Sequence, residues 1–404
     1  MLPEGWKKRR LGDIFKFKNG LNGDSTLYGA GAKFVNVMDV FRGSRLRHHE
    51  IIGEMIATAK QLDEFGIKFG DVFFNRTSET DDEIAFAAVY LDDKAAVFGG
   101  FVIRARPIDQ SLTPEFCTYA FQSAFIRRSM IRLGQGAIRS NIGQGDLTTV
   151  PIKFPPIAEQ RRIAEILSTW DRAIAVQEQL VANARAQKKA LMQTLLTGKK
   201  RLPGFKGDWQ RLSFDEIFKV ENDKKTQVQK TQYKAVGRTP IVDQGQDFIV
   251  GYTDQDEIYE SIPAIVFGDH TRSIKWIDFP FCPGADGTQI LKSTRHIHLQ
   301  FSFYLLLSAE IPNLGYSRHM RELKALTFNV PSDRHEQEKL TELLAAAEDQ
   351  NHKHENALTQ LVAEKSALMQ QLLTGKRRVK VETLDTKLEN QIREATKMVG
   401  GVTE

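Results

Sequence analysis

Two long stretches of the chain carry apolar residues at spacings of about three and four positions, the pattern of a helix packed against another helix. Neither stretch contains proline or glycine, whereas prolines precede both and Gly198 and Gly375 follow them. The pattern predicts one helix within residues 155–201 and another within residues 331–378. At 1.5 Å per residue, the stretch from 159 to 196 would form a rod roughly 55 Å long.

The apolar positions of these stretches are expected to hold the two helices together. Because the first helix leads into the second globular segment and the second helix leaves it, paired helices must run antiparallel. Gln177, Asn351 and His354 interrupt the seam near its middle, where buried polar groups can fix the register. The alternative, two unrelated surface helices, is disfavoured by the near-identity of the stretches. The positions expected to pair are Ile163, Leu167, Trp170 and Ile174 in the first helix and Leu340, Leu344, Leu361 and Leu368 in the second.

An internal duplication organises the chain. The segment 190–201 recurs as 367–378 at an offset of 177 residues, with ten of twelve positions identical. The same offset carries the pair Glu159-Gln160 onto Glu336-Gln337, whereas Trp6 corresponds to Trp209 at an offset of 203. The different offsets mean that the intervening segments differ in length. Each half therefore consists of a variable globular segment followed by a nearly constant helical one.

The globular segments, residues 1–154 and 202–330, contain short apolar runs bounded by glycine, proline and aspartate. Runs such as 70–75, 100–104 and 262–267 predict strands separated by turns. One helix is expected near the end of each segment, around 114–129 and around 299–308. These features predict an α+β fold and leave the strand topology open.

The composition is that of an ordinary folded protein, with 41% hydrophobic and 26% charged residues among 404. No apolar run reaches the ~20 residues of a membrane helix, and the first residues lack the apolar core of a secretory signal. We therefore expect no membrane association and a cytoplasmic location. The two cysteines, Cys117 and Cys282, are too few for a disulfide framework and are expected to be buried or neutral thiols. A net charge of +5 favours a polyanionic partner, but is weak evidence alone.

Three polar clusters have the chemistry of a nucleic-acid interface. Arginine can contact guanine edges, asparagine can contact adenine edges, and hydroxyl groups can contact phosphates. A solvated charged face is the alternative for any single residue, but similar placement in the two halves favours the clusters. Arg139, Asn141, Arg318 and His319 are the strongest candidates. The full set is Arg127, Arg128, Arg132, Arg139 and Asn141 in the first half and His270, Arg272, Lys275, Tyr316, Arg318, His319 and Arg321 in the second.

Motifs for catalysis or cofactor binding are missing from the sequence. Neither the glycine-rich loop that holds nucleotide phosphates nor a dinucleotide fingerprint occurs. The Asn- or Asp-Pro-Pro-aromatic tetrad with which amino-methyltransferases hold an extruded base is also missing. The histidine pairs at 48/49, 296/298 and 352/354 have no cysteine or carboxylate at ligand spacing. We therefore expect no catalytic residue, metal or cofactor in this chain.

At these repeats the sequence resembles a known family. The run 155–167 with its Pro-Pro and Glu-Gln pairs, the trailing Leu-Met-x-x-Leu-Leu-Thr-Gly-Lys of both repeats, and the opening Leu2-Pro-x-Gly-Trp6 look like specificity subunits of type I restriction–modification systems. The resemblance covers the chain from end to end. It departs at residues 331–335, which replace the usual proline-rich start of the second helix, and it assigns no role to residues 379–404.

The resemblance implies two target recognition domains, residues 1–154 and 202–330, with an antiparallel two-helix coiled coil between them in a pseudo-twofold repeat. Each domain would read one half of a bipartite site in double-stranded DNA. Two methyltransferase subunits would dock on the helices and modify adenine at N6 with S-adenosylmethionine. Two restriction subunits, which translocate DNA with ATP and Mg, would join for cleavage. The chain itself would be non-catalytic and would act in phage defence, in the cytoplasm of a bacterial or archaeal cell and with the nucleoid when bound to DNA.

Two alternatives stand beside this interpretation. One is a specificity subunit of a methylation-only or fused nuclease system. The other, from a different class, is a coiled-coil scaffold that binds proteins alone.

Overall fold

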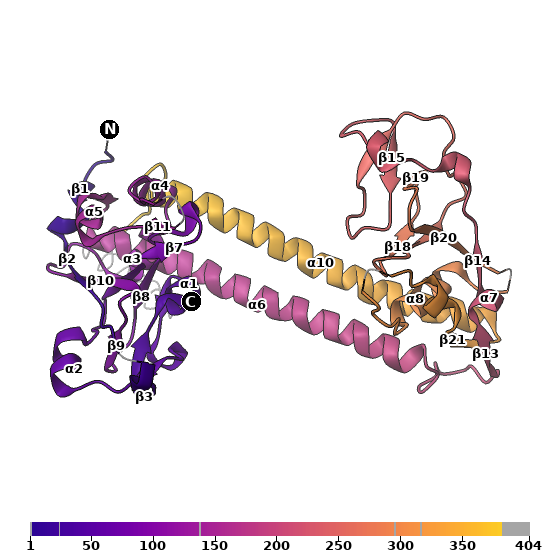
Figure 1. The fold of residues 1–404 in the computed structure, drawn as a ribbon, viewed down its shortest axis with the longest axis horizontal. Helices are drawn as coiled ribbons and strands as arrows, with labels where there is room; N and C mark the ends of the chain where they lie inside the picture. Colours follow the sequence, from indigo (N-terminus) through magenta and orange to yellow (C-terminus); the bar gives the residue numbers. More distant parts are fainter. Residues whose placement is uncertain (1, 24, 137–138, 295, 316, 382–404) are drawn as a thin grey trace, which may run out of the picture. The chain divides into compact units, whose positions relative to one another are not determined.

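The computed structural model describes residues 2–23, 25–136, 139–294, 296–315 and 317–381 (Figure 1). The chain divides into two units, which are residues 1–176 with 358–404, and residues 177–357. Two helices of 39 residues, α6 (Ile157–Leu195) and α10 (Arg334–Leu372), each contribute one part to each unit. Among the residues that the structure describes, none of the helices combines the length and apolar composition needed to span a bilayer.

Unit 1 is built on a five-stranded sheet whose central strands are almost completely buried. Val72, Phe73 and Phe74 of β6 have no exposed surface, as expected for a strand covered on both faces. The sheet has the order β2 (Phe15–Asn19), β10 (Val102–Pro107), β6 (Val72–Asn75), β8 (Ala87–Tyr90) and β4 (Arg45–Leu46). The smaller sheets pair β1 (Lys7–Arg10) with β12 (Pro151–Phe154), β11 (Ser140–Asn141) with β7 (Thr77–Ser78), and β3 (Tyr28–Val35) with β5 (Glu54–Met55) and β9 (Ala96–Phe98). The short helices are α1 (Val37–Phe41), α2 (Ala59–Phe65), α3 (Pro114–Ala120), α4 (Ala124–Ile131) and α5 (Gln144–Thr149).

Unit 2 repeats this plan with fewer elements. Its main sheet has the order β14 (Phe218–Val220), β20 (Thr288–Ser293), β17 (Ala264–Gly268) and β18 (Ile274–Ile277). The smaller sheets pair β13 (Trp209–Ser213) with β21 (Thr327–Pro331), and β15 (Thr239–Val242) with β16 (Gly251–Thr253) and β19 (Cys282–Pro283). The short helices are α7 (Phe214–Ile217), α8 (Leu299–Ser308) and α9 (Met320–Lys324).

The two units share one strand topology, which the sequence did not predict. In both main sheets the second strand in spatial order pairs antiparallel with its two neighbours, and the third pairs antiparallel with the fourth. In both three-stranded sheets the central strand has one antiparallel and one parallel partner. In both units the first strand pairs with the strand that leads into a long helix. The duplication seen in the helices therefore extends to the globular parts, whose sequences have diverged.

The predicted α+β fold and antiparallel pair of long helices are confirmed, with one local correction. The helix expected around 114–129 is two helices, α3 and α4, because the chain turns at residues 121–123. There the Ser123 hydroxyl accepts a hydrogen bond from the backbone N–H of Ile126 and so begins a new helix. The thiols of Cys117 and Cys282 are buried and unpaired, and burial raises the pKa of Cys282 to about 11.

In unit 1 the first part of α6 packs against the last part of α10 in the antiparallel sense. Ile163 and Leu167, both without exposed surface, share a core cluster with Leu372 and the half-buried Leu368. One turn along α6 from Leu167, the Asp171 carboxylate pairs with the Lys365 ammonium at 2.5 Å. Trp170 and Leu361, also expected in the seam, are half-buried, as is Ile174. Ile163 and Leu167 thus anchor both the helix pair and the core of the globular part.

In unit 2 the contacts are equivalent with the helices exchanged. Leu340 and Leu344 of α10 lie in one core cluster with Met192 and Leu195 of α6 and with Leu196, which follows α6. The Lys188 ammonium pairs with the Glu348 carboxylate at 2.7 Å. Lys188 and Glu348 are displaced by 177 residues from Lys365 and Asp171, so the same ion pair occurs once in each unit.

Both carboxylates also accept a hydrogen bond from a tyrosine hydroxyl of the adjoining globular part. Tyr119 of α3 donates to Asp171 at 2.5 Å, and Tyr304 of α8 donates to Glu348 at 3.0 Å. Each carboxylate therefore joins three elements, namely the two long helices and a helix of the globular part. In unit 1, Arg45 of β4 adds a fourth element, because its guanidinium donates to Asp171 at 2.8 Å.

A reciprocal ion pair closes each junction between a long helix and a globular part. Glu336, at the start of α10 and 1% exposed, accepts two hydrogen bonds from the Arg201 guanidinium that follows α6. Glu159, at the start of α6 and 3% exposed, accepts two from the Arg378 guanidinium that follows α10. These hydrogen bonds raise the pKa of both arginines above the ordinary value. The end of each helix is therefore held at the start of the other.

The glycines of the Thr-Gly-Lys segments complete these junctions. Gly198 and Gly375 have φ values of +71° and +72°, the left-handed conformation that ends many helices. A Cβ atom on Gly198 would lie 3.2 Å from the Trp209 ring, and one on Gly375 would lie 3.2 Å from the Trp6 ring. The two tryptophans that mark the starts of the halves in the sequence thus pack on the two helix ends.

The repeated glutamines lie inside the junctions. Gln160 is fully buried, accepts from the Thr113 N–H that begins α3 at 2.9 Å, and donates to the carbonyls of Ser111 and Pro155. Gln337, 1% exposed, accepts from the His298 N–H that begins α8 at 2.8 Å. Each glutamine therefore couples the start of a long helix to a short helix of its globular part.

We expect Gln160→Ala or Gln337→Ala to lower the free energy of unfolding of the affected unit by about 1–3 kcal/mol, because buried backbone groups would lose their partners. Gln179→Ala, at an exposed position of α6, is the matched control and should change stability by less than about 0.5 kcal/mol. Hydrogen exchange at the Thr113 and His298 amides during urea titration measures the effect. Unchanged protection of both amides would contradict this role for the glutamines.

Candidate nucleic-acid interface

Three loops of unit 1 converge at the end of the main sheet. The Arg76 N–H, just after β6, donates to the carbonyl of Phe101 in the β9–β10 turn at 3.0 Å. The Arg76 carbonyl in turn accepts from the N–H of Ile142, in the loop before α5, at 3.0 Å. Asn141 exchanges backbone hydrogen bonds with Gln135 at 2.8 and 2.9 Å, which closes that loop into a hairpin. We call this set of loops the three-loop surface of unit 1.

Unit 2 has the same arrangement at the same topological positions. The Asp269 N–H, just after β17, donates to the carbonyl of Gly287 in the β19–β20 turn at 2.7 Å. The Asp269 carbonyl accepts from the N–H of His319, in the loop before α9, at 2.8 Å. Asp269, Gly287 and His319 therefore stand where Arg76, Phe101 and Ile142 stand in unit 1. The backbone scaffold is common to both units, and the side chains that it presents differ.

Several predicted residues are exposed on these surfaces. The Arg139 side chain is 67% exposed and lies 3.6 Å from the Glu79 carboxylate, itself 83% exposed. In unit 2 the Arg318 side chain is 71% exposed and lies 4.0 Å from Asp286. Exposed pairs of this length contribute little free energy, so both guanidinium groups can exchange their partner for a phosphate or a base. Exposed Asn141 donates from its amide to the Arg139 carbonyl at 2.9 Å.

Arg127 is the first of three predicted contact residues that the fold uses internally, and its prediction was wrong. It is 9% exposed, and its guanidinium donates to the carbonyls of Ala85 and Asp82 at 2.7 Å and stacks 4.6 Å from the Phe86 ring centroid. Burial lowers the pKa of this guanidinium to about 10. It lies on the apolar face of α4 beside Ile126 and Met130, a helical phase that the sequence shows.

Lys275 and His319 are the other two corrections. Lys275 is 5% exposed and its ammonium donates to the carbonyls of Asp243 and Asp247, and burial lowers its pKa. His319 has no exposed surface, because its Nδ1 donates to the Asp269 carbonyl at 2.9 Å and its Nε2 accepts from the Leu314 N–H at 3.2 Å. These side chains hold the loops of unit 2 in place and are not available for contact.

The remaining predicted residues have mixed placements. Arg128 and Arg132 are exposed but line a groove between α4 and the end of α10. The Arg272 guanidinium donates to the Ile311 carbonyl at 3.0 Å, and the His270 N–H donates to the Gln244 side chain at 3.1 Å. Arg321 is exposed on α9. Tyr316 lies outside the described residues.

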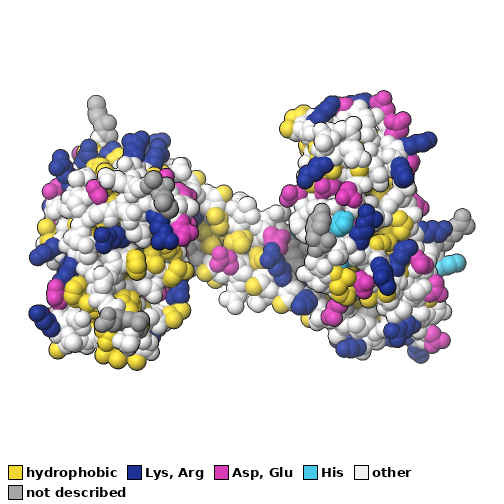
Figure 2. Space-filling view, viewed as in Figure 1, with side chains coloured by type: hydrophobic (Ala, Val, Ile, Leu, Met, Phe, Trp, Pro, Cys, Tyr) yellow, Lys and Arg dark blue, Asp and Glu magenta, His cyan; other side chains and the backbone are white. Residues whose placement is uncertain are grey.

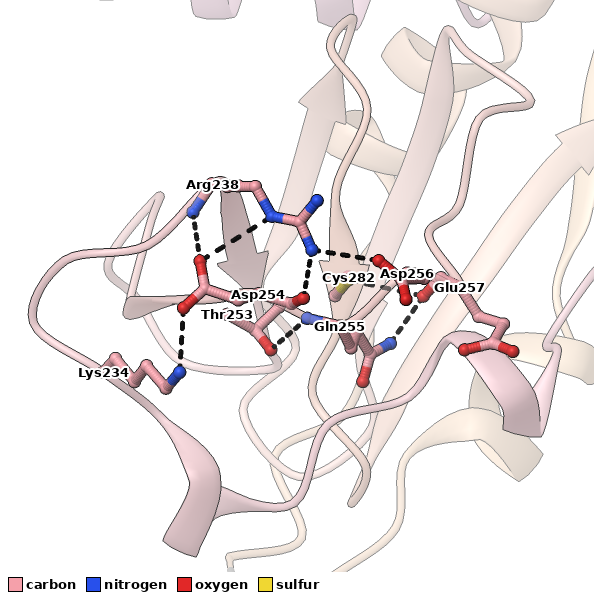
Figure 3. Close-up of polar contacts among 8 residues, drawn as sticks. All are labelled: Lys234, Arg238, Thr253, Asp254, Gln255, Asp256, Glu257 and Cys282. Carbon is pink, nitrogen blue, oxygen red and sulfur yellow. Dashed lines mark hydrogen bonds and ion pairs between the residues drawn. The ribbon is translucent and has the colours of Figure 1, made fainter.

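The β15–β16 sheet of unit 2 also carries basic side chains, which acidic ones neutralise. Asp254 accepts from the Lys234 ammonium at 2.8 Å and from the Arg238 N–H at 3.0 Å, contacts that lower its pKa (Figure 3). The Arg238 guanidinium also pairs with Asp256 at 3.0 Å. Figure 2 shows basic side chains interspersed with acidic ones on unit 2, and gathered along one edge of unit 1. The exposed arginines of the three-loop surfaces are therefore better placed for a polyanion than Lys234 or Arg238.

Two residues of the three-loop surface escaped the sequence analysis. Exposed Arg76 follows a buried strand, with no other basic residue beside it to mark it. Phe101 lies in the apolar run 100–104, which predicts a strand, and an aromatic residue in a strand is usually buried. In the structure it is 67% exposed. Both become visible only when the loops are assembled.

Comparisons with known proteins agree with this architecture. Residues 3–184 match the model of the type I restriction modification DNA specificity domain. The chain is 23% identical to a putative type I restriction enzyme MjaX specificity subunit of Methanocaldococcus jannaschii, over 94% of this chain and 95% of that protein. The chain is therefore similar to type I specificity subunits over almost its whole length.

Other relatives of this chain match over shorter segments or in fold. It is 36% identical over 85 residues to the type I restriction enzyme EcoR124I/EcoR124II specificity subunit of Escherichia coli, which is 20% of each chain. The crystal structure of a type I S subunit from M. genitalium has a TM-score of 0.58 at 17% identity, over 92% of this chain and 97% of that one. A chain from a structural study of complex assembly and conformational transition of the type I R-M system also has a TM-score of 0.58, at 18% identity, over 93% of this chain and 100% of that one.

For the internal arginine we expect Arg127→Ala to lower the free energy of unfolding of unit 1 by about 2 kcal/mol, because two carbonyls lose buried donors. Arg128→Ala, the exposed neighbour on α4, should leave stability within about 0.5 kcal/mol of the parent. Urea denaturation followed by hydrogen exchange in α4 makes the comparison. Equal stability of the two variants would show that Arg127 has no structural role.

Proposed function

We propose that this protein is the non-catalytic DNA-reading specificity subunit of a type I restriction–modification complex, and that its two three-loop surfaces each read one half of a bipartite site in duplex DNA. The methyltransferase subunits would carry S-adenosylmethionine and modify adenine, and the restriction subunits would use ATP and Mg. Similarity to type I specificity subunits over 94% of the chain supports the assignment to such a system. The reading of DNA is supported by the surfaces themselves.

The observation that carries this proposal is the common backbone scaffold with unlike side chains. Two equivalent hydrogen bonds hold the loops together in each unit, so the backbone that carries them is joined in the same way. Unit 1 presents Arg76, Arg139 and Asn141, whereas unit 2 presents Arg318. Two surfaces that share a backbone arrangement but carry different side chains are suited to a DNA site whose two halves differ in sequence.

The exposed groups have the chemistry that base reading needs. A guanidinium can donate two hydrogen bonds to a guanine edge or to a phosphate, and the Asn141 amide can pair with an adenine edge. A contact to a phosphate would strengthen binding to all sequences, whereas a contact to a base edge would discriminate among them.

We expect Arg139→Ala or Asn141→Ala to relax or change the sequence of one half-site, and Arg318→Ala to do so for the other, because each side chain serves one reader. Losing one base contact should weaken discrimination at that position by about 1–3 kcal/mol. Methylation mapping in a host that carries the subunit and its methyltransferase measures both half-sites at once. Lys234→Ala is the matched control, since Asp254 already holds that cation. A single substitution that alters both half-sites together would refute independent readers.

The same experiments separate the alternatives. A protein scaffold that does not bind DNA would show no affinity for duplex that falls with salt. A methylation-only system would give the same half-site map but no cleavage of unmodified DNA by the assembled complex.

Two grooves that share repeated helix positions are candidates for docking of two copies of one methyltransferase. A groove of about 780 Å³ in unit 1 is lined by α4 and by residues 366–376 at the end of α10. A groove of about 530 Å³ in unit 2 includes Lys189, Met192 and Gln193 at the end of α6. Met192 and Gln193 correspond to Met369 and Gln370 of the first groove in the repeat.

Several residues near the ends of the two repeats are identical and exposed. Four such pairs are Ala190 and Ala367, Gln193 and Gln370, Thr197 and Thr374, and Lys199 and Lys376. Two copies of the same partner would need the same surface twice. The repeat supplies that surface once in each unit.

The double variant Gln193→Glu, Gln370→Glu should weaken assembly with the methyltransferase by about tenfold or more, because each partner would meet a new charge at its interface. Gln187→Glu is the control, since this exposed position of α6 corresponds to Glu364 in α10, where an acid already stands. Analytical ultracentrifugation of mixtures reads out the stoichiometry. If the double variant still bound two methyltransferases as tightly as the parent, the grooves would not be the docking sites.

A further inference from the structure

Phe101 is a large apolar side chain in a place where hydrophobic packing does not explain it. It lies at the tip of the β9–β10 turn and is 67% exposed, whereas Phe98 three residues earlier has no exposed surface. At the tip of a loop of the three-loop surface, the exposed ring is available to an apolar partner outside the chain.

The turn holds the backbone of Phe101 in place. The Gly100 N–H donates to the Leu21 carbonyl at 3.1 Å, and the Leu21 N–H donates to the Phe98 carbonyl at 2.8 Å. A Cβ atom on Gly99 would overlap the Phe34 ring, and one on Gly100 would overlap the Asn22 amide, so the turn packs closely against these side chains. With the Phe101 carbonyl also bonded to the Arg76 N–H, the backbone that carries the ring is positioned in advance of binding, so little backbone entropy is lost when the ring engages.

The groups around the ring indicate the kind of partner. Arg76 is exposed and hydrogen-bonded to Phe101 through the backbone, and Ile142, bonded to Arg76, is adjacent in sequence to exposed Asn141. Arg139 lies two residues further back in the same loop. Phe101 therefore belongs to a set of loops that also carry exposed guanidinium and amide groups, the combination that suits a surface on which stacked bases lie between phosphates. Proteins that kink duplex DNA insert side chains such as phenylalanine between base steps in this setting.

We infer that Phe101 is a wedge that enters the duplex at the half-site read by unit 1, where it supports the base step opened when the target adenine is turned out of the stack. This inference rests on the proposed DNA-reading function. Turning a base out costs the stacking and pairing energy of that base, which a ring inserted in the gap partly replaces. The role is that of a positioning residue, because Phe101 would act on the DNA and the methyl transfer would occur on the partner.

The wedge belongs to one unit only. The position equivalent to Phe101 in unit 2 is Gly287, whose carbonyl accepts the corresponding hydrogen bond from Asp269 and whose neighbour Asp286 is acidic. Unit 2 therefore presents no aromatic ring at this turn. Substitution of Phe101 should therefore slow methylation at one half-site and leave the rate at the other unchanged.

The test uses the full complex of this subunit with its methyltransferase on its mapped site. Phe101→Ala should slow methylation of the adenine in the half-site of unit 1 by about tenfold, and the other adenine should be methylated within about twofold of the parent rate. With 2-aminopurine in place of each target adenine in turn, the fluorescence increase that reports unstacking should fall at the unit 1 position alone. Phe101→Trp should retain both signals. Phe69→Ala, which removes a ring 48% exposed elsewhere in unit 1, is the matched control and should match the parent.

The outcomes separate the wedge from the proposed function. Equal loss at both adenines, or no loss at either, would overturn the wedge while leaving DNA reading intact. A parent complex that shows no sequence preference at all would overturn both. Because the ring is exposed, Phe101→Ala should fold like the parent, and its melting temperature confirms that a loss of rate is not a loss of structure.

Discussion

The pairing of a buried carboxylate at the start of each long helix with an arginine beyond the end of the other is the constraint on which the rest of the structure depends. Glu336 and Glu159 are almost completely buried, and an isolated carboxylate there would be strongly destabilising. Arg201 and Arg378 remove that penalty only if each helix end lies at the start of the opposite helix. The ion pairs therefore specify the antiparallel register as much as they stabilise it.

The same junctions separate what is fixed in this molecule from what has diverged. Within them, the glutamate, glutamine, glycine and arginine positions are repeated at an offset of 177 residues, with their contacts. Beyond them, the strands keep their order and sense while their side chains differ. Gln160 and Gln337 make the same kind of hydrogen bond to the globular part of their unit. The attachment to the long helices is therefore the same in both units, and the loops can differ without disturbing the helices.

Much of the helical framework could be predicted from the sequence, and much of the interface could not. The repeat is a local pattern, so helix positions and antiparallel pairing followed from spacing and chain order. Strand order did not follow, because short apolar runs such as 70–75 fit many pairings and long-range register decides among them. Arg127 and Arg128 are adjacent and chemically identical, but only Arg128 faces solvent, since helical phase places Arg127 with Ile126 and Met130. Phe101 and Arg76 were missed because their meaning arises from three loops that are distant in sequence.

One polar contact at the middle of the helices occurs once among the residues that the structure describes. Gln177 donates to the His354 carbonyl at 2.9 Å and lies 3.1 Å from its Nδ1, and these two positions are related to each other by the repeat offset. The arginine–glutamate, lysine–carboxylate and glutamine contacts occur once in each unit. The contact of Gln177 with His354 instead joins a position to its own counterpart in the repeat, so a substitution at either residue removes a contact for which the duplication supplies no second copy.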